Sequence, residues 1–167
     1  MQSSKSAFIA LIRLGLGQSL NIEPANNWRK IETFAIQHGL LGVVVDGIER
    51  LPESSRPPKD LLLQWIGLVM QDETRYAIQQ KAAAEMALLF HDNYISTYVL
   101  KGAVVAECYP KPKHRVSSDM DCFLLPDKGD FDAWALGNDL IKSKGYETET
   151  DFYKNSAFHL PGLTVEN

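Results

Sequence analysis

Two aspartates, Asp119 and Asp121, are separated by a single residue in an otherwise apolar run. The run predicts a strand over residues 119–125, and residues i and i+2 of a strand face the same side. Neighbouring carboxylates repel each other unless a cation lies between them. Mg²⁺ suits such a pair, because it binds one or two carboxylates and keeps its other positions for water and phosphate oxygens. Together with a glycine turn at Gly102, the pair predicts a platform for a metal ion and a triphosphate.

An Asp-x-Asp pair is not specific to one class of protein. The pattern occurs by chance in many chains. It also occurs in glycosyltransferases that hold a metal and a nucleotide sugar, but these need a longer nucleotide-binding sheet before the motif. An EF-hand is excluded, because Phe123 and Leu124 would occupy its fifth and sixth positions, and the sixth must be glycine.

The first half of the chain predicts helices that would support this platform. Apolar residues recur at helical spacing, and glycines or prolines punctuate the segments. The second helix is expected to begin near Pro24 and Ala25 and to end at Gly39. The expected helices span residues 7–16, 25–38, 40–51 and 59–94, with a loop over 51–58.

The composition changes near Asn93, where β-branched and aromatic residues predict a strand over residues 94–100. Pro161 and Gly162 predict a turn between two further strands. Asp130 is the expected N-cap of the last helix. The remaining expected elements are helices over 103–109 and 131–144 and strands over 119–125, 157–160 and 163–167.

These elements predict an α+β fold, in which a helical N-terminal region precedes a small mixed sheet flanked by helices. The expected domains are a helical region over residues 1–93 and an α/β core over 94–167. The last expected strand reaches Asn167. We therefore expect the α/β core to be truncated at its C-terminus.

Composition narrows the class of protein. The chain has 167 residues and a net charge of −4, from 17 Lys and Arg against 21 Asp and Glu. This balance argues against an extended nucleic-acid surface, and 45% apolar residues argue against disorder. Cys108 and Cys122 are expected to be reduced thiols. With neither an export signal nor a membrane segment evident, we expect a cytoplasmic protein.

In this context the pair resembles the DNA polymerase beta-like nucleotidyltransferase superfamily. More closely, residues 25–167 are similar to an uncharacterised bacterial nucleotidyltransferase-like family. The family is marked by a leucine-lysine-glycine turn, then an arginine, then Asp-x-Asp. The matching segments are Val99-Leu100-Lys101-Gly102-Ala103, Tyr109-Pro110, Arg115, Ser118-Asp119-Met120-Asp121, Gly145-Tyr146 and Val165-Glu166. The resemblance implies a nucleotidyltransferase-type fold and transfer of a nucleoside monophosphate from an NTP to an acceptor hydroxyl.

The resemblance also implies two Mg²⁺ ions held by three carboxylates. Asp119 and Asp121 match the first two, and Glu166 matches the third, although an exposed hairpin acid is the alternative. Gly102 matches the glycine that lets phosphate approach. Ala103 stands where the superfamily has serine or glycine, so a hydroxyl contact is lost.

Lys101 is expected to supply some of the charge lost at Ala103, its alternative being a solvated lysine. Arg115 and Ser118 precede the aspartates. A guanidinium suits phosphate oxygens, so these residues are expected to bind nucleotide. The alternative for Arg115 is that it pairs with an aspartate. His114 and His159 are expected to be exposed or satisfied histidines.

Two functions follow. The first is a Mg²⁺-dependent enzyme that acts on an NTP and on a small-molecule or protein hydroxyl. The second is a catalytically inactive module of the same fold that binds nucleotide or a protein partner. The departure at Ala103 and the incomplete neighbourhood of Glu166 motivate the second.

Overall fold

The computed structural model describes residues 3–19, 27–151 and 155–167. Local sequence explains the starts of the first two helices, α1 (Ser4–Gly15) and α2 (Trp28–Gln37). The Ser3 side chain accepts a hydrogen bond from the Ser6 N–H, and the Asn27 side chain accepts one from Lys30 N–H. The start expected near Pro24 and Ala25 lies outside the described residues. α3 (Leu41–Glu49) and a 3₁₀ turn, η1 (Glu53–Ser55), follow.

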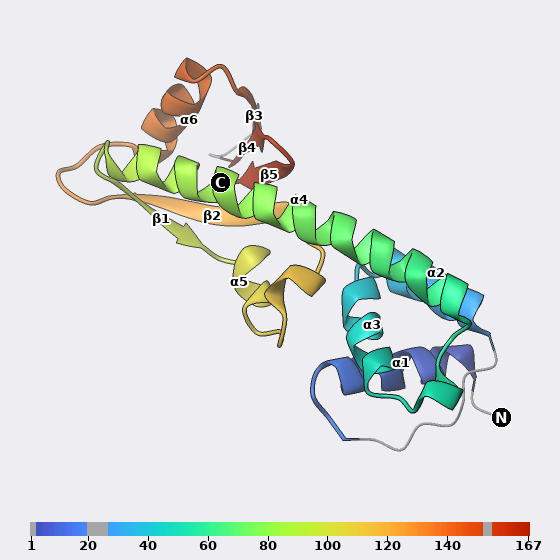
Figure 1. Ribbon diagram of the computed structural model, residues 1–167. Coiled ribbons are helices and arrows are strands. Elements are labelled where there is room, and N and C mark those ends of the chain that lie inside the picture. The colour runs from blue at the N-terminus through green and yellow to red at the C-terminus, as the bar shows by residue number, and fades with distance from the viewer. Residues whose placement is uncertain (1–2, 20–26, 152–154) are drawn as a thin grey trace. The chain divides into compact units, whose positions relative to one another are not determined.

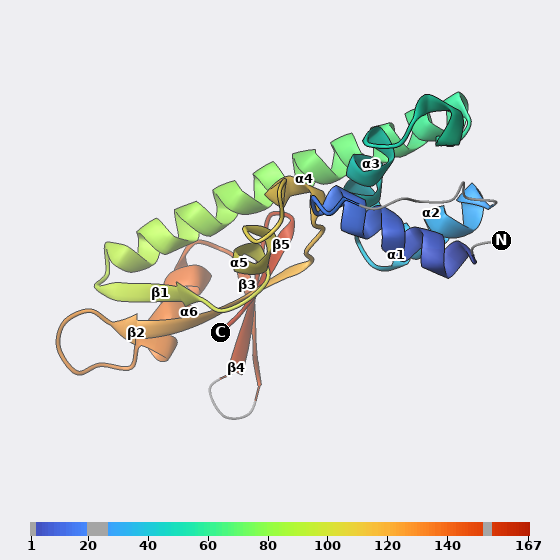
Figure 2. The ribbon, with the colours of Figure 1, turned by 90° about the horizontal axis from the view of Figure 1, so that it is seen from below.

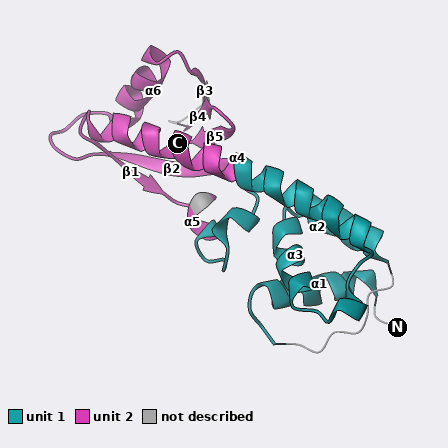
Figure 3. Ribbon diagram, viewed as in Figure 1, with its two compact units in different colours: residues 1–74, 106–116 teal, residues 75–105, 117–167 magenta. Residues whose placement is uncertain are grey.

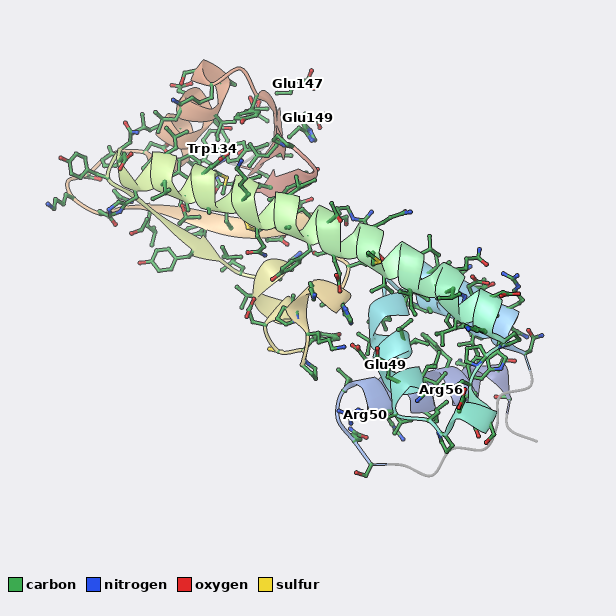
Figure 4. All side chains as sticks on the ribbon, in the orientation of Figure 1. Glu49, Arg50, Arg56, Trp134, Glu147 and Glu149 are labelled. Carbon is green, nitrogen blue, oxygen red and sulfur yellow. The ribbon has the colours of Figure 1, made fainter. Side chains whose placement is uncertain are left out.

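The helix α4 (Lys59–His91) contributes to two compact units. Unit 1 comprises residues 1–74 and 106–116, and unit 2 comprises residues 75–105 and 117–167 (Figure 3). In unit 1, buried apolar residues of α1, α2, α3 and α4 form one core that includes Leu11, Ile31, Val44 and Trp65. Arg56 donates hydrogen bonds to the carbonyls of Leu51 and Glu49, near the end of α3 (Figure 4). The domain boundary at residues 93 and 94 stays a prediction.

Unit 2 is built on a mixed sheet of five strands in the described part of the chain. The strand order is β1-β2-β5-β4-β3; β2 and β5 are parallel, and the other neighbours are antiparallel. The strands are β1 (Ile95–Val99), β2 (Asp119–Pro126), β3 (Glu147–Asp151), β4 (Asn155–Leu160) and β5 (Leu163–Glu166). The short helix α5 (Ala103–Ala106) follows β1, and α6 (Ala133–Ser143) follows β2. A 3₁₀ turn, η2 (Pro112–His114), belongs to unit 1.

The sheet has two different faces. Alternate residues of β2, namely Met120, Cys122 and Leu124, are buried against side chains of α4 and α6. In both ribbon views α4 runs along β1 and β2 (Figures 1 and 2). The intervening residues of β2 belong to the opposite face, which we call the open face because Phe123 and Leu125 are exposed on it.

The α+β fold predicted from the sequence is confirmed, and so is the hairpin, in which Leu160 pairs with Leu163. One strand was missed, and two expectations about the elements were wrong in detail. β3 was not predicted, because its sequence, Glu-Thr-Glu-Thr-Asp, lacks apolar residues and lies at the sheet edge. The N-cap of α6 is Asp132 rather than Asp130, and α5 ends at Ala106.

The sequence also raises expectations about membrane-spanning segments and about the oxidation state of the two cysteines. No helix in the described residues has the length and apolar character needed to span a membrane. Both cysteines are free, Cys108 exposed and Cys122 buried. Burial raises the pKa of the Cys122 thiol to about 12, so this thiol stays protonated and is a poor nucleophile.

Candidate active site

The three predicted carboxylates lie on the neighbouring strands β2 and β5. Asp119 and Asp121 are two residues apart in β2 and therefore share the open face. The parallel register sets Asp121 beside Glu166 and Asp119 beside Thr164. Residues in register on adjacent strands face the same side of a sheet. The fold thus brings all three acids to one face, although Glu166 is 45 residues from Asp121 in sequence.

Gln79, a buried residue of α4, anchors the beginnings of both strands. Its side-chain nitrogen donates to the carbonyl of Ser117 at 3.1 Å and to that of Gly162 at 2.8 Å. Ser117 lies just before β2, and Gly162 lies just before β5. One side-chain amide therefore holds together the residues just before β2 and β5, the two strands that carry the three acids. Sequence reasoning missed this residue, because a glutamine in a long helix gives no signal until its burial is known.

The turn after β1 brings Lys101 to the carboxylates. Its ammonium lies 2.8 Å from a carboxylate oxygen of Asp121. The Lys101 side chain is 64% exposed, whereas that of Asp121 is 15% exposed. The pKa of Lys101 is raised above its ordinary value, mainly because its ammonium donates a hydrogen bond to Asp121. The negative charges of Asp121, Glu166 and Asp119 raise it further. Lys101 therefore stays charged and partly neutralises an acidic face.

Gly102 allows this turn to lie against the backbone of β2. Its φ is +75°, a conformation that side chains with a Cβ rarely adopt. A Cβ at this position would lie 2.4 Å from the carbonyl oxygen of Asp119, which is too close for any real contact. The glycine predicted from the family pattern is therefore required by the local geometry.

The other predicted nucleotide-binding residues are placed differently. The hydroxyl of Ser118 lies 3.4 Å from a carboxylate oxygen of Asp119. Ala103 begins α5, but its side chain lies outside the described residues. Arg115 belongs to unit 1, whereas the carboxylates belong to unit 2. The roles of these residues in nucleotide binding stay predictions.

The donor set suits a hard divalent cation only in part. Asp119 and Asp121 offer carboxylate oxygens, which Mg²⁺ prefers, and one or two such ligands are usual for Mg²⁺. Within the described residues, no group of three or more acidic, histidine or cysteine side chains is arranged to hold a metal. Asp121 is paired with an ammonium instead. The aspartate pair therefore supplies two ligands of the kind that Mg²⁺ prefers, with Glu166 beside them in register, and Lys101 would have to leave Asp121 for a metal ion to bind there.

A polar cavity adjoins Glu166 and is lined by residues of β3, β4 and β5. Its volume is about 320 Å³, and Glu166 forms part of its wall. Glu149 of β3 (Figure 4) also lines it, together with Thr150, Asn155 and residues of β4. Polar groups thus predominate on this side of Glu166.

Unit 1 holds a second ionic cluster that the sequence did not reveal. His114 is only 6% exposed, and its Nδ1 and Nε2 lie 2.7 Å from Asp46 and 2.8 Å from Glu73. Lys111 pairs with Asp46 at 2.5 Å and with Glu49, and Lys113 pairs with Glu73 at 3.1 Å. We call these six residues the His114 cluster. Both lysines are thus paired with acids, and His114 is the satisfied histidine that was expected.

The His114 cluster favours the charged forms of His114, Asp46 and Glu73. The hydrogen bond that His114 donates to Asp46 outweighs burial and, with the one it donates to Glu73, raises the pKa of His114 above its ordinary 6.5. Burial alone would raise the pKa of Asp46, but hydrogen bonds from His114 and Lys111 lower it below 3.8. Hydrogen bonds from His114 and Lys113 likewise lower the pKa of Glu73. Both ring nitrogens of His114 are occupied, so the cluster stabilises unit 1 rather than offering a base.

Comparison with known proteins adds one finding. A family model described as an uncharacterised nucleotidyltransferase matches residues 24–167. The match includes Asp119, Asp121, Glu166 and the turn at Gly102. Comparison with curated proteins and with solved structures gives no significant match. The family predicted from residues 25–167 is therefore confirmed.

Proposed function

Because the chain belongs to the uncharacterised nucleotidyltransferase family, we propose that it transfers a nucleoside monophosphate from an NTP to an acceptor hydroxyl, in a Mg²⁺-dependent reaction. The acceptor is a small molecule or a protein hydroxyl. The observation that carries the proposal is the grouping of Asp119, Asp121 and Glu166 on the open face, next to a turn bearing Lys101 and Gly102. Family membership supports the reaction class, and this grouping supports the choice of residues.

The reaction is a displacement at the α-phosphorus. The acceptor oxygen forms a bond to this phosphorus, the bond between the α-phosphorus and the bridging oxygen breaks, and pyrophosphate leaves. Mg²⁺ held by Asp119 and Asp121 would neutralise the negative charge of the phosphate oxygens. Glu166 would accept the proton of the acceptor hydroxyl, since it lies beside Asp121 and borders the polar cavity.

Lys101 and Gly102 would hold the phosphates. The Lys101 ammonium already pairs with Asp121, and its long exposed side chain can turn to a phosphate oxygen when a metal neutralises that carboxylate. Gly102 has no side chain, so its backbone can lie close to a phosphate. Ser118, whose hydroxyl lies beside Asp119, is a further proposed phosphate contact.

A turnover assay tests the proposal. Pyrophosphate release from each of the four NTPs would be measured with Mg²⁺ and with EDTA, across hydroxyl-bearing acceptors. The proposal predicts release that requires Mg²⁺ and falls by about a hundredfold or more in Asp119→Asn, the scale of losing one group that stabilises a charged transition state. Asp139→Asn, on α6, is the matched control and should retain activity.

The inactive-module alternative makes a different prediction. The pairing of Lys101 with Asp121 favours it, because an internal cation can replace a metal. It predicts nucleotide binding without pyrophosphate release at any Mg²⁺ concentration. Release by the wild type that Asp119→Asn does not diminish would contradict the assignment of Asp119.

A further inference from the structure

The open face carries apolar side chains next to its carboxylates. Tyr98 of β1 and Phe123 of β2 are register partners, and each is 53% exposed. Leu125, two residues further along β2, is 42% exposed. Partners in register lie side by side on one face. We call these three residues the aromatic platform.

The aromatic platform lies next to the charged groups of the open face. Phe123 follows Asp121 by two residues of the same strand, which places their backbones about 7 Å apart and their side chains on one face. Tyr98 precedes Lys101 by three residues. A ligand held at Asp121 and Lys101 could therefore reach Phe123 and Tyr98 through a linker the size of a pentose ring.

The two sides of the carboxylates differ in chemistry. Towards β1 the open face presents the aromatic platform, and towards β3 it presents the polar cavity beside Glu166. A nucleotide has the same division, because a flat ring with two π-faces is joined through a sugar to a polyanion. A hydroxyl-bearing acceptor suits the polar cavity better than it suits exposed aromatic rings.

We propose that the aromatic platform is the base-binding subsite, on which the nucleobase of the NTP stacks while its phosphates lie at Asp119, Asp121 and Lys101. This inference rests on the proposed function. Stacking accepts every base, because each base has a π-face. Neither Tyr98 nor Phe123 makes a base-specific pattern of hydrogen bonds, so the subsite selects for a planar ring more than for one base.

Two ligands separate this inference from the proposed function. Mg-ATP carries a base, whereas Mg-tripolyphosphate presents a phosphate chain alone. Titration calorimetry would measure the affinity of each for the wild type and for the double variant Tyr98→Thr/Phe123→Thr. Threonine is chosen because it retains a high strand propensity. The control is Leu88→Gln, which removes an apolar side chain that is 62% exposed on α4.

The subsite predicts that the double variant binds Mg-ATP at least tenfold more weakly, since stacking on each ring contributes severalfold. Affinity for Mg-tripolyphosphate should stay within twofold, and Leu88→Gln should change neither. Equal Mg-ATP affinity in the wild type and the double variant would overturn the subsite and leave the proposed function intact. A wild type that binds neither ligand would overturn both.

The four NTPs provide a second readout. Stacking predicts affinities within about tenfold of one another, with purines tighter than pyrimidines because their rings are larger. The double variant should reduce this difference between purines and pyrimidines. Binding of only one of the four NTPs, undiminished in the double variant, would show that the base is recognised elsewhere.

Discussion

Both units gather carboxylates around lysines, but they neutralise them to different degrees. In unit 1, Asp46, Glu49 and Glu73 are matched by Lys111, Lys113 and His114, with the histidine buried between two acids. In unit 2, Asp119, Asp121 and Glu166 share a face with Lys101, which pairs with one of them and is itself largely exposed. A cluster that supplies its own counter-ions leaves little charge to attract a ligand, whereas one that leaves negative charge in excess favours binding of an external cation.

Removal of the buried imidazole should produce the largest change. His114→Ala removes a buried side chain whose ring nitrogens bridge Asp46 and Glu73. Lys111 and Lys113 still pair with these acids, so the cost comes from the cavity and the lost hydrogen bonds, about 2–5 kcal/mol. The free energy of unfolding of unit 1 would be measured in urea, in a Trp134→Phe background where Trp28 and Trp65 report on this unit. His159→Ala, at a half-exposed histidine of unit 2, is the control. Equal stabilities for the two variants would show that the His114 cluster contributes nothing.

Gly102→Ala should destabilise unit 2 by about 1–3 kcal/mol, the cost of a strained backbone, with a further cost from the clash at the Asp119 carbonyl. Gly129→Ala separates the cost of backbone strain from the cost of the clash, since Gly129 also has a positive φ but has open space around it. Amide hydrogen exchange in β2 would measure both variants. If Gly129→Ala opens β2 as much as Gly102→Ala does, the close approach at Gly102 has no energetic weight.

The His114 cluster should also make the stability of unit 1 depend on pH. The pKa of His114 is raised in the folded chain, so its stabilisation is complete below pH 6.5 and is lost as the pH rises through the raised value. At the acid end, the lowered pKa of Asp46 means that stability falls as the pH drops below 3.8. His114→Gln should flatten the alkaline loss in urea titrations of unit 1. The stability that the wild type loses at alkaline pH should be smaller than the stability lost in His114→Ala, because a neutral imidazole still donates one hydrogen bond. An unchanged alkaline slope in His114→Gln would refute the assignment.

The smallest effect is expected at Lys101. Lys101→Met keeps the aliphatic stem and removes the competitor for Asp121, so Mn²⁺ alone should bind a fewfold more tightly. Mg-ATP should bind a fewfold more weakly, because a phosphate contact is lost. Calorimetry would follow both ligands, with Lys113→Met in unit 1 as the control. Changes of the same sign for both ligands would contradict the two roles given to Lys101.

Local patterns predicted much of the site. The alternation in β2 predicted that Asp119 and Asp121 share a face, and the Pro161-Gly162 turn predicted the hairpin that carries Glu166. The residues alone did not predict that β5 lies between β2 and β4, because the parallel pairing depends on packing and on the hydrogen bonds of Gln79. The placement of Glu166 beside Asp121 follows from that pairing.

The His114 cluster was missed for the same reason. Asp46 and Glu73 are 68 and 41 residues from His114, so no local spacing relates them. One signal was present, because Asp46 interrupts the apolar segment of residues 40–48, and an acid on a buried helix needs a partner. The identity of that partner could come only from the folded chain.

A matched pair of substitutions tests the difference between the clusters most directly. Asp121→Asn and Asp46→Asn remove one carboxylate each, from the open face and from the His114 cluster, and urea unfolding and calorimetric Mg-ATP binding would be measured for both. Asp121→Asn should abolish Mg-ATP binding with little loss of stability, whereas Asp46→Asn should lower the stability of unit 1 and preserve binding. If Asp121→Asn instead destabilises the chain and leaves Mg-ATP affinity unchanged, the carboxylates of the open face are structural and the proposed activity is wrong.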